Sequence, residues 1–129
     1  YGQAGHGAEP NIGIGRFIVV GETDAEALGI ARRAYPVWHD SFSYLFKYRG
    51  GPGPLHPRPP DFDTMAASGR AVAGSPDTVA EAMRFELSES GANYLVGQFV
   101  FGDMSPEEAE KSVAMFIEKV MPDLLSLET

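Results

Sequence analysis

The sequence predicts an α/β protein with parallel strands, and three stretches of the chain carry this prediction. Residues 17–20 form a short, wholly apolar run, and residues 94–101 run almost without a charge. Strands that are covered on both faces have this composition. Between them, residues 76–90 have the pattern of a helix that delivers the chain into the second strand. Such a unit is typical of parallel sheets, so we expect the two strands to lie parallel and adjacent.

The helix predicted over residues 76–90 has signals at both ends. Ser75 is placed to cap it, and Pro76 takes the first helical position, where its missing N–H costs nothing. Gly91 then stops the helix as a left-handed residue. Apolar residues spaced by four form its buried stripe, namely Val79, Met83 and Leu87.

A second helical pattern follows the first strand. Thr23 and Glu26 have the spacing of a capping box. The helix after them buries one face, made of Leu28, Ala31, Tyr35, Trp38, Phe42 and Leu45. Pro36 interrupts this pattern and removes one backbone hydrogen bond. We therefore expect two helical pieces that meet in a kink or break near Pro36.

Two segments predict no regular structure. Residues 1–15 are rich in glycine and predict a flexible lead-in. Residues 49–65 form a long loop, with five prolines and three glycines between residues 50 and 60. A loop of this length is rarely an idle connector, and one interpretation is a surface insertion with polyproline character.

The chain ends in a third helical pattern. Ser105, Pro106 and Glu108 begin it with a second capping box, and Pro122 is expected to end it. Its buried stripe consists of Ala109, Val113, Phe116, Ile117 and Val120. An apolar tail follows, with Leu124, Leu125 and Leu127.

Composition limits the classes of function. The chain has 129 residues, which predicts a single domain over residues 1–129, and its net charge is −8 at pH 7. An acidic chain without a basic cluster argues against a nucleic-acid or anionic-membrane partner. The chain has no cysteine, which excludes disulfides and thiolate catalysis and fits a cytoplasmic location. Its start has neither an initiator Met nor a signal-peptide pattern, so we expect a chain cut from something longer.

Three stretches, taken in order, resemble a known family. They are Gly74-Ser-Pro-Asp-Thr-Val, the turn Ser90-Gly-Ala-Asn, and Val120-Met-Pro-Asp-Leu within the last helix. This set resembles the C-terminal end of luciferase-like flavin-dependent monooxygenases, over roughly residues 16–125. The resemblance implies a TIM (β/α)8 barrel, which needs about 250 residues. The chain would then be the C-terminal part of a barrel, with about two parallel strands covered on one side by three to four helices.

The resemblance also implies a function for the parent protein. Luciferase-like monooxygenases use reduced flavin and O2 to oxidise a small organic substrate, and the cofactor here would be FMN or the deazaflavin F420. The loop at 49–65 would close over the flavin site and exclude water. The alternative interpretation is a non-catalytic luciferase-like fragment or paralogue that acts as a self-associating module.

Trp38 and His39 are the candidate cofactor-binding residues, because the family has a similar aromatic stretch near its flavin cavity. Trp38 would pack against the isoalloxazine ring, and His39 would donate a hydrogen bond to a flavin oxygen. The competing interpretation places Trp38 in the core, in register with Tyr35 and Phe42. No residue has the pattern of a nucleophile or general base, so the catalytic residues stay unassigned. The three histidines lack a metal-ligand spacing, so no metal site is expected.

The missing part of the barrel leads to two further expectations. The phosphate anchor and one wall of the ring slot would lie in absent strands, so this chain alone should be inactive and hold no tightly bound flavin. Strand faces without a cover and open strand edges predict a homo-oligomer in which copies pair their sheets.

Overall fold

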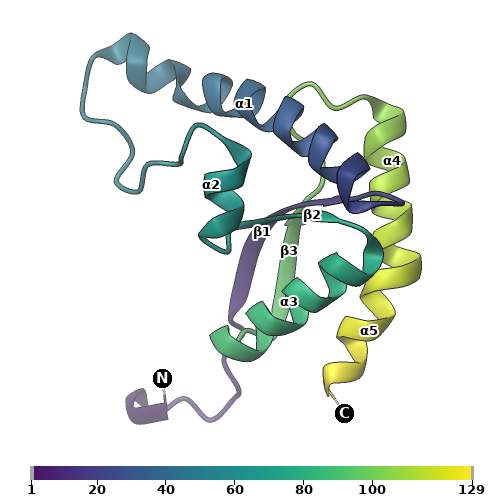
Figure 1. Ribbon diagram of the computed structural model, residues 1–129. Helices are drawn as coiled ribbons and strands as arrows, with labels where there is room; N and C mark the ends of the chain where they lie inside the picture. Colours follow the sequence, from purple (N-terminus) through teal and green to yellow (C-terminus); the bar gives the residue numbers. More distant parts are fainter. Residues whose placement is uncertain (1, 129) are drawn as a thin grey trace.

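The computed structural model describes residues 2–128, and within them three parallel strands form one sheet (Figure 1). The strands are β1 (Gly13–Val20), β2 (Ala71–Gly74) and β3 (Tyr94–Gln98), in the order β2-β1-β3. The predicted parallel pairing of the first strand with the 94–101 segment is confirmed, with Gly13 opposite Tyr94. β2 is a third strand beyond the two predicted. Its four residues, rich in alanine and glycine, are too short to give a strand pattern.

Helices cover both faces of the sheet, so the prediction of helices on one side only is wrong. Phe17 and Val19 of β1 pack in one buried cluster with α1 (Asp24–Arg49) and α2 (Phe62–Ala67). Ile18 and Val20, which point to the opposite face, pack in a second cluster. Its helical members come from α3 (Pro76–Ser90) and the C-terminal helices, which begin with α4 (Pro106–Met115).

The strand order explains why the helices lie on opposite faces. From β1 the chain crosses by α1 to β2 at one edge, and from β2 it crosses back by α3, past β1, to β3 at the other edge. Two crossovers of the same hand that run in opposite directions place their helices on opposite sides of a sheet. A closed barrel would instead place the strands in chain order, with β3 next to β2.

α1 is one continuous helix of 26 residues, so the predicted break at Pro36 is wrong. Its ends follow the expected rules, with the Thr23 side chain accepting from the Glu26 N–H and Gly50 in the left-handed region at φ 62°. Pro36 removes the hydrogen bond to the carbonyl of Arg32, a residue on the solvent side of the helix. Water can solvate that carbonyl, so the helix continues.

Three predicted boundaries shift. The irregular part of the 49–65 loop is residues 50–61, because Arg49 ends α1 and α2 begins at Phe62. β1 begins at Gly13, inside the predicted 1–15 lead-in, which also holds a one-turn 3₁₀ helix at Gly2–Ala4. β3 stops at Gln98, because Phe101 turns into the core instead of continuing the strand.

The C-terminal helix continues past Pro122 instead of ending there. α4 leads into a wide turn of π type over Phe116–Val120, then α5 (Met121–Leu125) and a 3₁₀ turn at Ser126–Glu128. The Met121 N–H donates to the Phe116 carbonyl, five residues back. Pro122 has no N–H for a regular helical bond, and the widened turn before it accommodates this loss.

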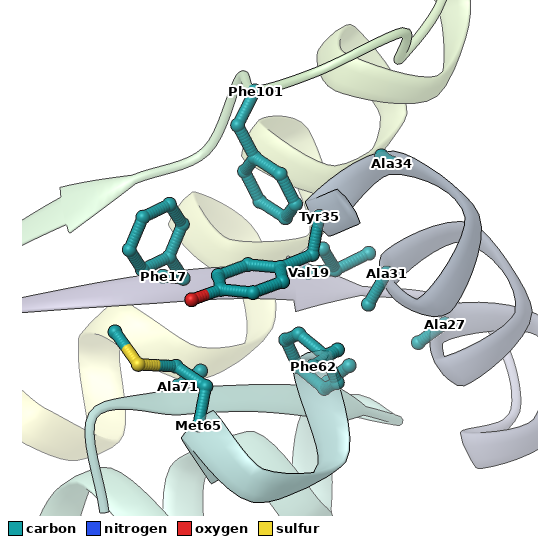
Figure 2. Packing of buried hydrophobic residues seen from close by; sticks show 11 residues of the cluster. Phe17, Val19, Ala27, Ala31, Ala34, Tyr35, Phe62, Met65, Ala71 and Phe101 are labelled. Carbon is teal, nitrogen blue, oxygen red and sulfur yellow. The ribbon is translucent and has the colours of Figure 1, made fainter. Parts of the chain in front are cut away.

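Tyr35 lies at the centre of the first buried cluster, and its side chain is fully buried. Figure 2 shows its ring surrounded by Phe17 of β1, by Phe62 and Met65 of α2, and by Phe101 after β3, which come from three different parts of the chain. The Tyr35 ring meets Phe17 edge to face, with centroids 5.5 Å apart. This cluster fixes α1, α2 and the segment after β3 onto one face of the sheet.

Candidate functional site

A series of aromatic rings leads from the sheet to the outer part of α1. The Trp38 indole packs edge to face with the Phe17 ring, with the ring centroids 4.7 Å apart. It stacks on the Phe42 ring, with the centroids 5.0 Å apart and only 14° between the two planes. The centroid of the Phe42 ring in turn lies 5.8 Å from that of the Phe46 ring. The spacing of four residues places Trp38, Phe42 and Phe46 on one face of the helix.

This series places Trp38, one of the two predicted flavin contacts, partly within the core. The indole packs against the first buried cluster and lies 5.4 Å from Tyr35, as the competing interpretation expected. Phe42 covers one of its faces. A flavin ring that stacked on this face of Trp38 would have to displace Phe42.

His39, the second predicted contact, holds the proline-rich loop. Its Nε2 lies 2.9 Å from the carbonyl oxygen of Arg58. A carbonyl can only accept, so Nε2 carries the proton and donates this bond. A neutral His39 then keeps Nδ1 as its acceptor, and its Nε2–H is already engaged by the loop.

The loop at residues 50–61 is fastened to α1 at two neighbouring carbonyls. One is the Arg58 carbonyl at His39, and the other is the Pro59 carbonyl, which accepts from the Tyr35 hydroxyl at 2.8 Å. Burial raises the pKa of Tyr35 above its usual value, so the hydroxyl keeps the proton that it donates. The structure therefore brings His39 and Tyr35 into contact with the loop, next to Trp38. Tyr35 is the further contributor, and only its place in the apolar stripe could be read from the sequence.

The carboxyl ends of the strands are where open α/β sheets place ligands, and three helices begin there. Each has its first turn capped from its own chain, by Thr23, Ser75 and Ser105. The Ser75 N–H also donates to Asp24 Oδ1 at 2.8 Å, which lowers the pKa of Asp24, with help from the Thr78 side chain. Ser75 is thus the N-cap predicted from the sequence. In each of these helices the capping side chain therefore already uses one of the N–H donors with which a phosphate would be bound.

Ion pairs tie the same end of the molecule together. Arg33 binds both oxygens of Glu108, at 2.6 and 3.1 Å, and reaches Asp103 at 3.3 Å. The Arg33 guanidinium and the Ser105 N–H lower the pKa of Glu108 to about 2. Lys111 bridges Glu22 at 3.3 Å and Glu26 at 3.1 Å. Each of these carboxylates is paired with Arg33 or Lys111, so we assign them a structural role.

The segment after β3 lies tightly against α1. Gly102 has φ of 61°, and a Cβ at this position would collide with the Ala34 carbonyl. Only glycine satisfies both conditions. This approach lets Phe101 enter the core and places Asp103 beside Arg33.

A cavity of about 580 Å³ lies near the amino-terminal end of β3, between α3 and α5. Its side chains are mostly apolar, and include Leu87, Leu95, Phe99, Phe116, Met121 and Leu124. The Asn93 amide at its rim is engaged, since it donates to the Pro10 carbonyl at 3.0 Å and accepts from the Ile12 N–H at 2.8 Å. From the sequence, only an apolar tail could be predicted in this region, because the cavity depends on how α5 lies against α3.

Two classes of feature are absent from residues 2–128. No group of three or more His, Asp or Glu side chains in this range is placed to hold a metal ion. None of its helices is long and apolar enough to cross a membrane.

Known proteins resemble this chain both in sequence and in structure. An uncharacterized protein of Sinorhizobium fredii, y4wF, is 34% identical over 112 residues, which cover 87% of this chain and 32% of y4wF. The crystal structure of monooxygenase RslO1 from Streptomyces bottropensis matches with a TM-score of 0.67 at 22% identity, over 94% of this chain and 33% of that one. Apo-MsnO8 matches with a TM-score of 0.53 at 21% identity, over 86% of this chain and 35% of that one. No family model matches the sequence.

The chain therefore spans about a third of the length of each protein that it matches. At these identities the two structural matches show similarity of fold, which is an α/β arrangement shared with part of a monooxygenase.

Proposed function

We propose that this chain corresponds to the C-terminal part of a luciferase-like, flavin-dependent monooxygenase. The observation that carries the proposal is the match to RslO1, in which nearly all of this chain, 94%, aligns with 33% of a monooxygenase. The parent enzyme would use reduced FMN or F420 and O2 to oxidise a small organic substrate. The cytoplasmic location expected from the cysteine-free sequence belongs to the same proposal.

The barrel assignment belongs to this proposal as well. A TIM barrel needs β3 beside β2, whereas in this chain β3 pairs with β1. The outer edges of β2 and β3 end the three-stranded sheet of residues 2–128, so further strands could pair there. We propose that β3 moves next to β2 when the other strands of a barrel are present.

The residues of this chain alone do not fit a flavin. Phe42 covers one face of Trp38, and His39 Nε2 is engaged by the Arg58 carbonyl. Near the loop, one N–H of the Arg58 guanidinium donates to the His56 carbonyl and one N–H of the Arg70 guanidinium donates to Ser68, so a phosphate would have to compete with these bonds. We therefore propose that the isolated chain binds flavin only at about millimolar concentration and does not turn over.

Titration with FMN, followed by the fluorescence of Trp38, tests the proposal for this chain. Trp38 is the only tryptophan, so any quenching reports on this site. Weak quenching without saturation is expected. A saturable response at micromolar FMN that strengthens in Phe42→Ala would show that a flavin site is already complete.

A chimera tests the proposal for the parent enzyme. The 112 aligned residues of y4wF would be replaced by the matching residues of this chain. The chimera should bind FMN or F420 and consume O2 in the presence of a reductant, as unmodified y4wF should. If y4wF itself binds neither cofactor, the flavin assignment is wrong.

The second candidate function is a non-catalytic, self-associating module. The observation that favours it is the exposure of large apolar side chains on the outer half of α1, including Tyr48 at 77% and Tyr44 at 61%. Such surfaces are uncommon on monomers and mark sites of interaction.

A further inference from the structure

The outer half of α1, residues 37–49, projects beyond the sheet toward the proline-rich loop (Figure 1). Only four of its thirteen side chains are charged or histidine. One face carries the aromatic series described above, in which Trp38 is partly buried while Phe42 and Phe46 are exposed at 39% and 36%. The rest of this helix segment therefore presents apolar side chains without an intramolecular function.

A second stripe lies away from the aromatic series. It consists of exposed residues at a helical spacing of four, three and four: Val37, Ser41, Tyr44 and Tyr48. The Tyr44 and Tyr48 rings stack on each other, with centroids 6.0 Å apart. This spacing is the one with which a helix contacts another helix along a single seam. Ser41, near the middle, is small enough for a close approach.

One flank of this stripe carries two opposite charges, Asp40 and Lys47. They are seven residues apart, which is two helical turns, so they share one side of the helix. Within residues 2–128, neither side chain makes a hydrogen bond or an ion pair. When two copies of a helix pair antiparallel about a two-fold axis, the same flank of each helix meets itself, and residue i contacts residue j in both directions. Asp40 of each copy then lies opposite Lys47 of the other.

We propose that two copies of this chain associate through the outer halves of α1, antiparallel, with the two-fold axis beside Tyr44. This proposal rests on the self-associating module named above and specifies its surface. Pairing through the projecting helices needs no contact between the sheets, which are already covered on both faces. The sequence-based expectation that copies pair their sheets is thereby replaced by a helix contact.

Charge favours a second copy as the occupant. Residues 37–58 contain Lys47, Arg49 and Arg58 against Asp40, a net charge of +2, whereas the whole chain carries −8. The remainder of the chain therefore carries −10 (−8 minus +2). In the antiparallel arrangement the basic tip of each copy points toward the acidic remainder of the other, and the two acidic bodies lie at opposite ends. Such complementarity orients an encounter and disfavours other registers.

The contact is small, which sets the expected affinity. Thirteen helical residues extend about 20 Å, and one helix pair of this length buries less than the roughly 800 Å² per partner of a standard interface. We therefore expect a dimer that dissociates at concentrations on the order of 10–100 μM.

Sedimentation equilibrium at a series of protein concentrations tests the charge pairing. Asp40→Lys and Lys47→Asp each convert two attractive contacts into two repulsive ones, and each should weaken the dimer about tenfold or more. The double variant Asp40→Lys/Lys47→Asp exchanges the charges and should restore the affinity to within about threefold of the unmodified chain. Glu107→Lys and Lys119→Asp, the same changes at exposed sites of the C-terminal helices, serve as controls that leave the dimer unchanged.

A disulfide test locates the axis. The chain has no cysteine, so Tyr44→Cys supplies a single thiol. Under mild oxidation it should form a disulfide-linked dimer, because both copies place position 44 at the axis. Ser43→Cys, on the half-buried side of the same helical turn, should not crosslink.

The outcomes separate this proposal from the one on which it rests. A dimer that is indifferent to both charge reversals, or that crosslinks equally through positions 43 and 44, would overturn the helix contact and leave the module in place. A monomer at all concentrations up to 1 mM, on the order of the weakest specific affinities, would overturn both.

Discussion

The Tyr35 hydroxyl donates a 2.8 Å hydrogen bond to the Pro59 carbonyl, which joins a fully buried ring of α1 to the proline-rich loop 24 residues later. The ring packs among Phe17, Phe62 and Trp38, so the core holds its position. The loop therefore acquires its path from the core, although its own sequence predicts no regular structure.

The first prediction concerns this hydrogen bond. Tyr35→Phe keeps the buried ring and leaves the Pro59 carbonyl without its donor, so the free energy of unfolding should fall by about 1 kcal/mol. Hydrogen exchange should also become faster in residues 50–61. Urea denaturation measures the first effect. Tyr48→Phe, at a site that is 77% exposed, is the control that should leave stability within about 0.5 kcal/mol of the unmodified chain.

The same pair has a pH signature. Burial raises the pKa of Tyr35 above the unfolded value of 10.0, so its contribution to stability is complete below pH 10 and is lost as the pH rises beyond it. The stability difference between the chain and its Tyr35→Phe variant should therefore shrink above pH 10. A difference that stays constant through that range would contradict the assigned burial.

The second prediction concerns Ser112, a fully buried polar residue of α4. β3 ends at Gln98, which lies opposite Phe17 of β1. The Val20 N–H therefore has no acceptor on β3, and it donates instead to Ser112 Oγ at 2.9 Å. Ser112→Ala leaves this buried N–H without an acceptor and should lower stability by about 1–3 kcal/mol. Ser112→Thr keeps the hydroxyl as a comparison. Equal stability of the alanine variant and the unmodified chain would show that water reaches Val20.

The third prediction uses Glu108, whose pKa is lowered to about 2 by Arg33 and by the Ser105 N–H. A lowered pKa contributes stability above the unfolded value of 4.5, and this contribution is lost as the pH falls toward 2. Glu108→Gln keeps the capping oxygen and removes the charge. The variant should be less stable by about 1 kcal/mol at pH 7, because the ion pair is partly exposed. The two chains should converge near pH 2 in urea titrations.

The fourth prediction concerns the continuous helix at Pro36. Pro36→Ala supplies the N–H that the Arg32 carbonyl lacks and should stabilise the protein by about 1–3 kcal/mol. Pro106→Ala is the matched control, because Pro106 occupies the first turn of α4, where no helical partner is lost. The midpoint temperature of thermal unfolding should rise for Pro36→Ala only. No gain at Pro36 would mean that a helical hydrogen bond to the Arg32 carbonyl is worth no more than its solvation by water, and would contradict the prediction.

The local elements could be predicted because their signals are local. Ser75 and Ser105 cap helices as expected, Gly91 ends α3 in the left-handed region, and the two apolar runs form parallel strands. The predictions are wrong where contacts with residues distant in the chain determine the local structure. Pro36 is tolerated because its helix is anchored by Tyr35 and Ala31 in the core, and β2 is a strand because β1 offers it an edge.

The same distinction between local and distant contacts applies to the candidate site. The sequence placed Trp38, His39 and the loop near one another because they are close in the chain. It could not show that Phe42 stacks on Trp38, or that His39 points to the Arg58 carbonyl, because both depend on the path of the returning loop. The exposed charges Asp40 and Lys47 were equally visible in the sequence, but a continuous α1 is needed to place them on one flank.

The central position of β1 has a consequence for how the chain folds. β1 pairs with β2 across 54 residues (71 − 17) and with β3 across 81 (94 − 13). The longer closure costs only about 0.4 kcal/mol more in chain entropy, so loop length barely separates the two pairings. Order of synthesis separates them clearly, since at about 5–20 residues per second β2 follows β1 by several seconds, and β3 comes later still. Of these three strands, the one at the middle of the sheet is thus synthesised first, and its second edge is paired only after β3 has been made.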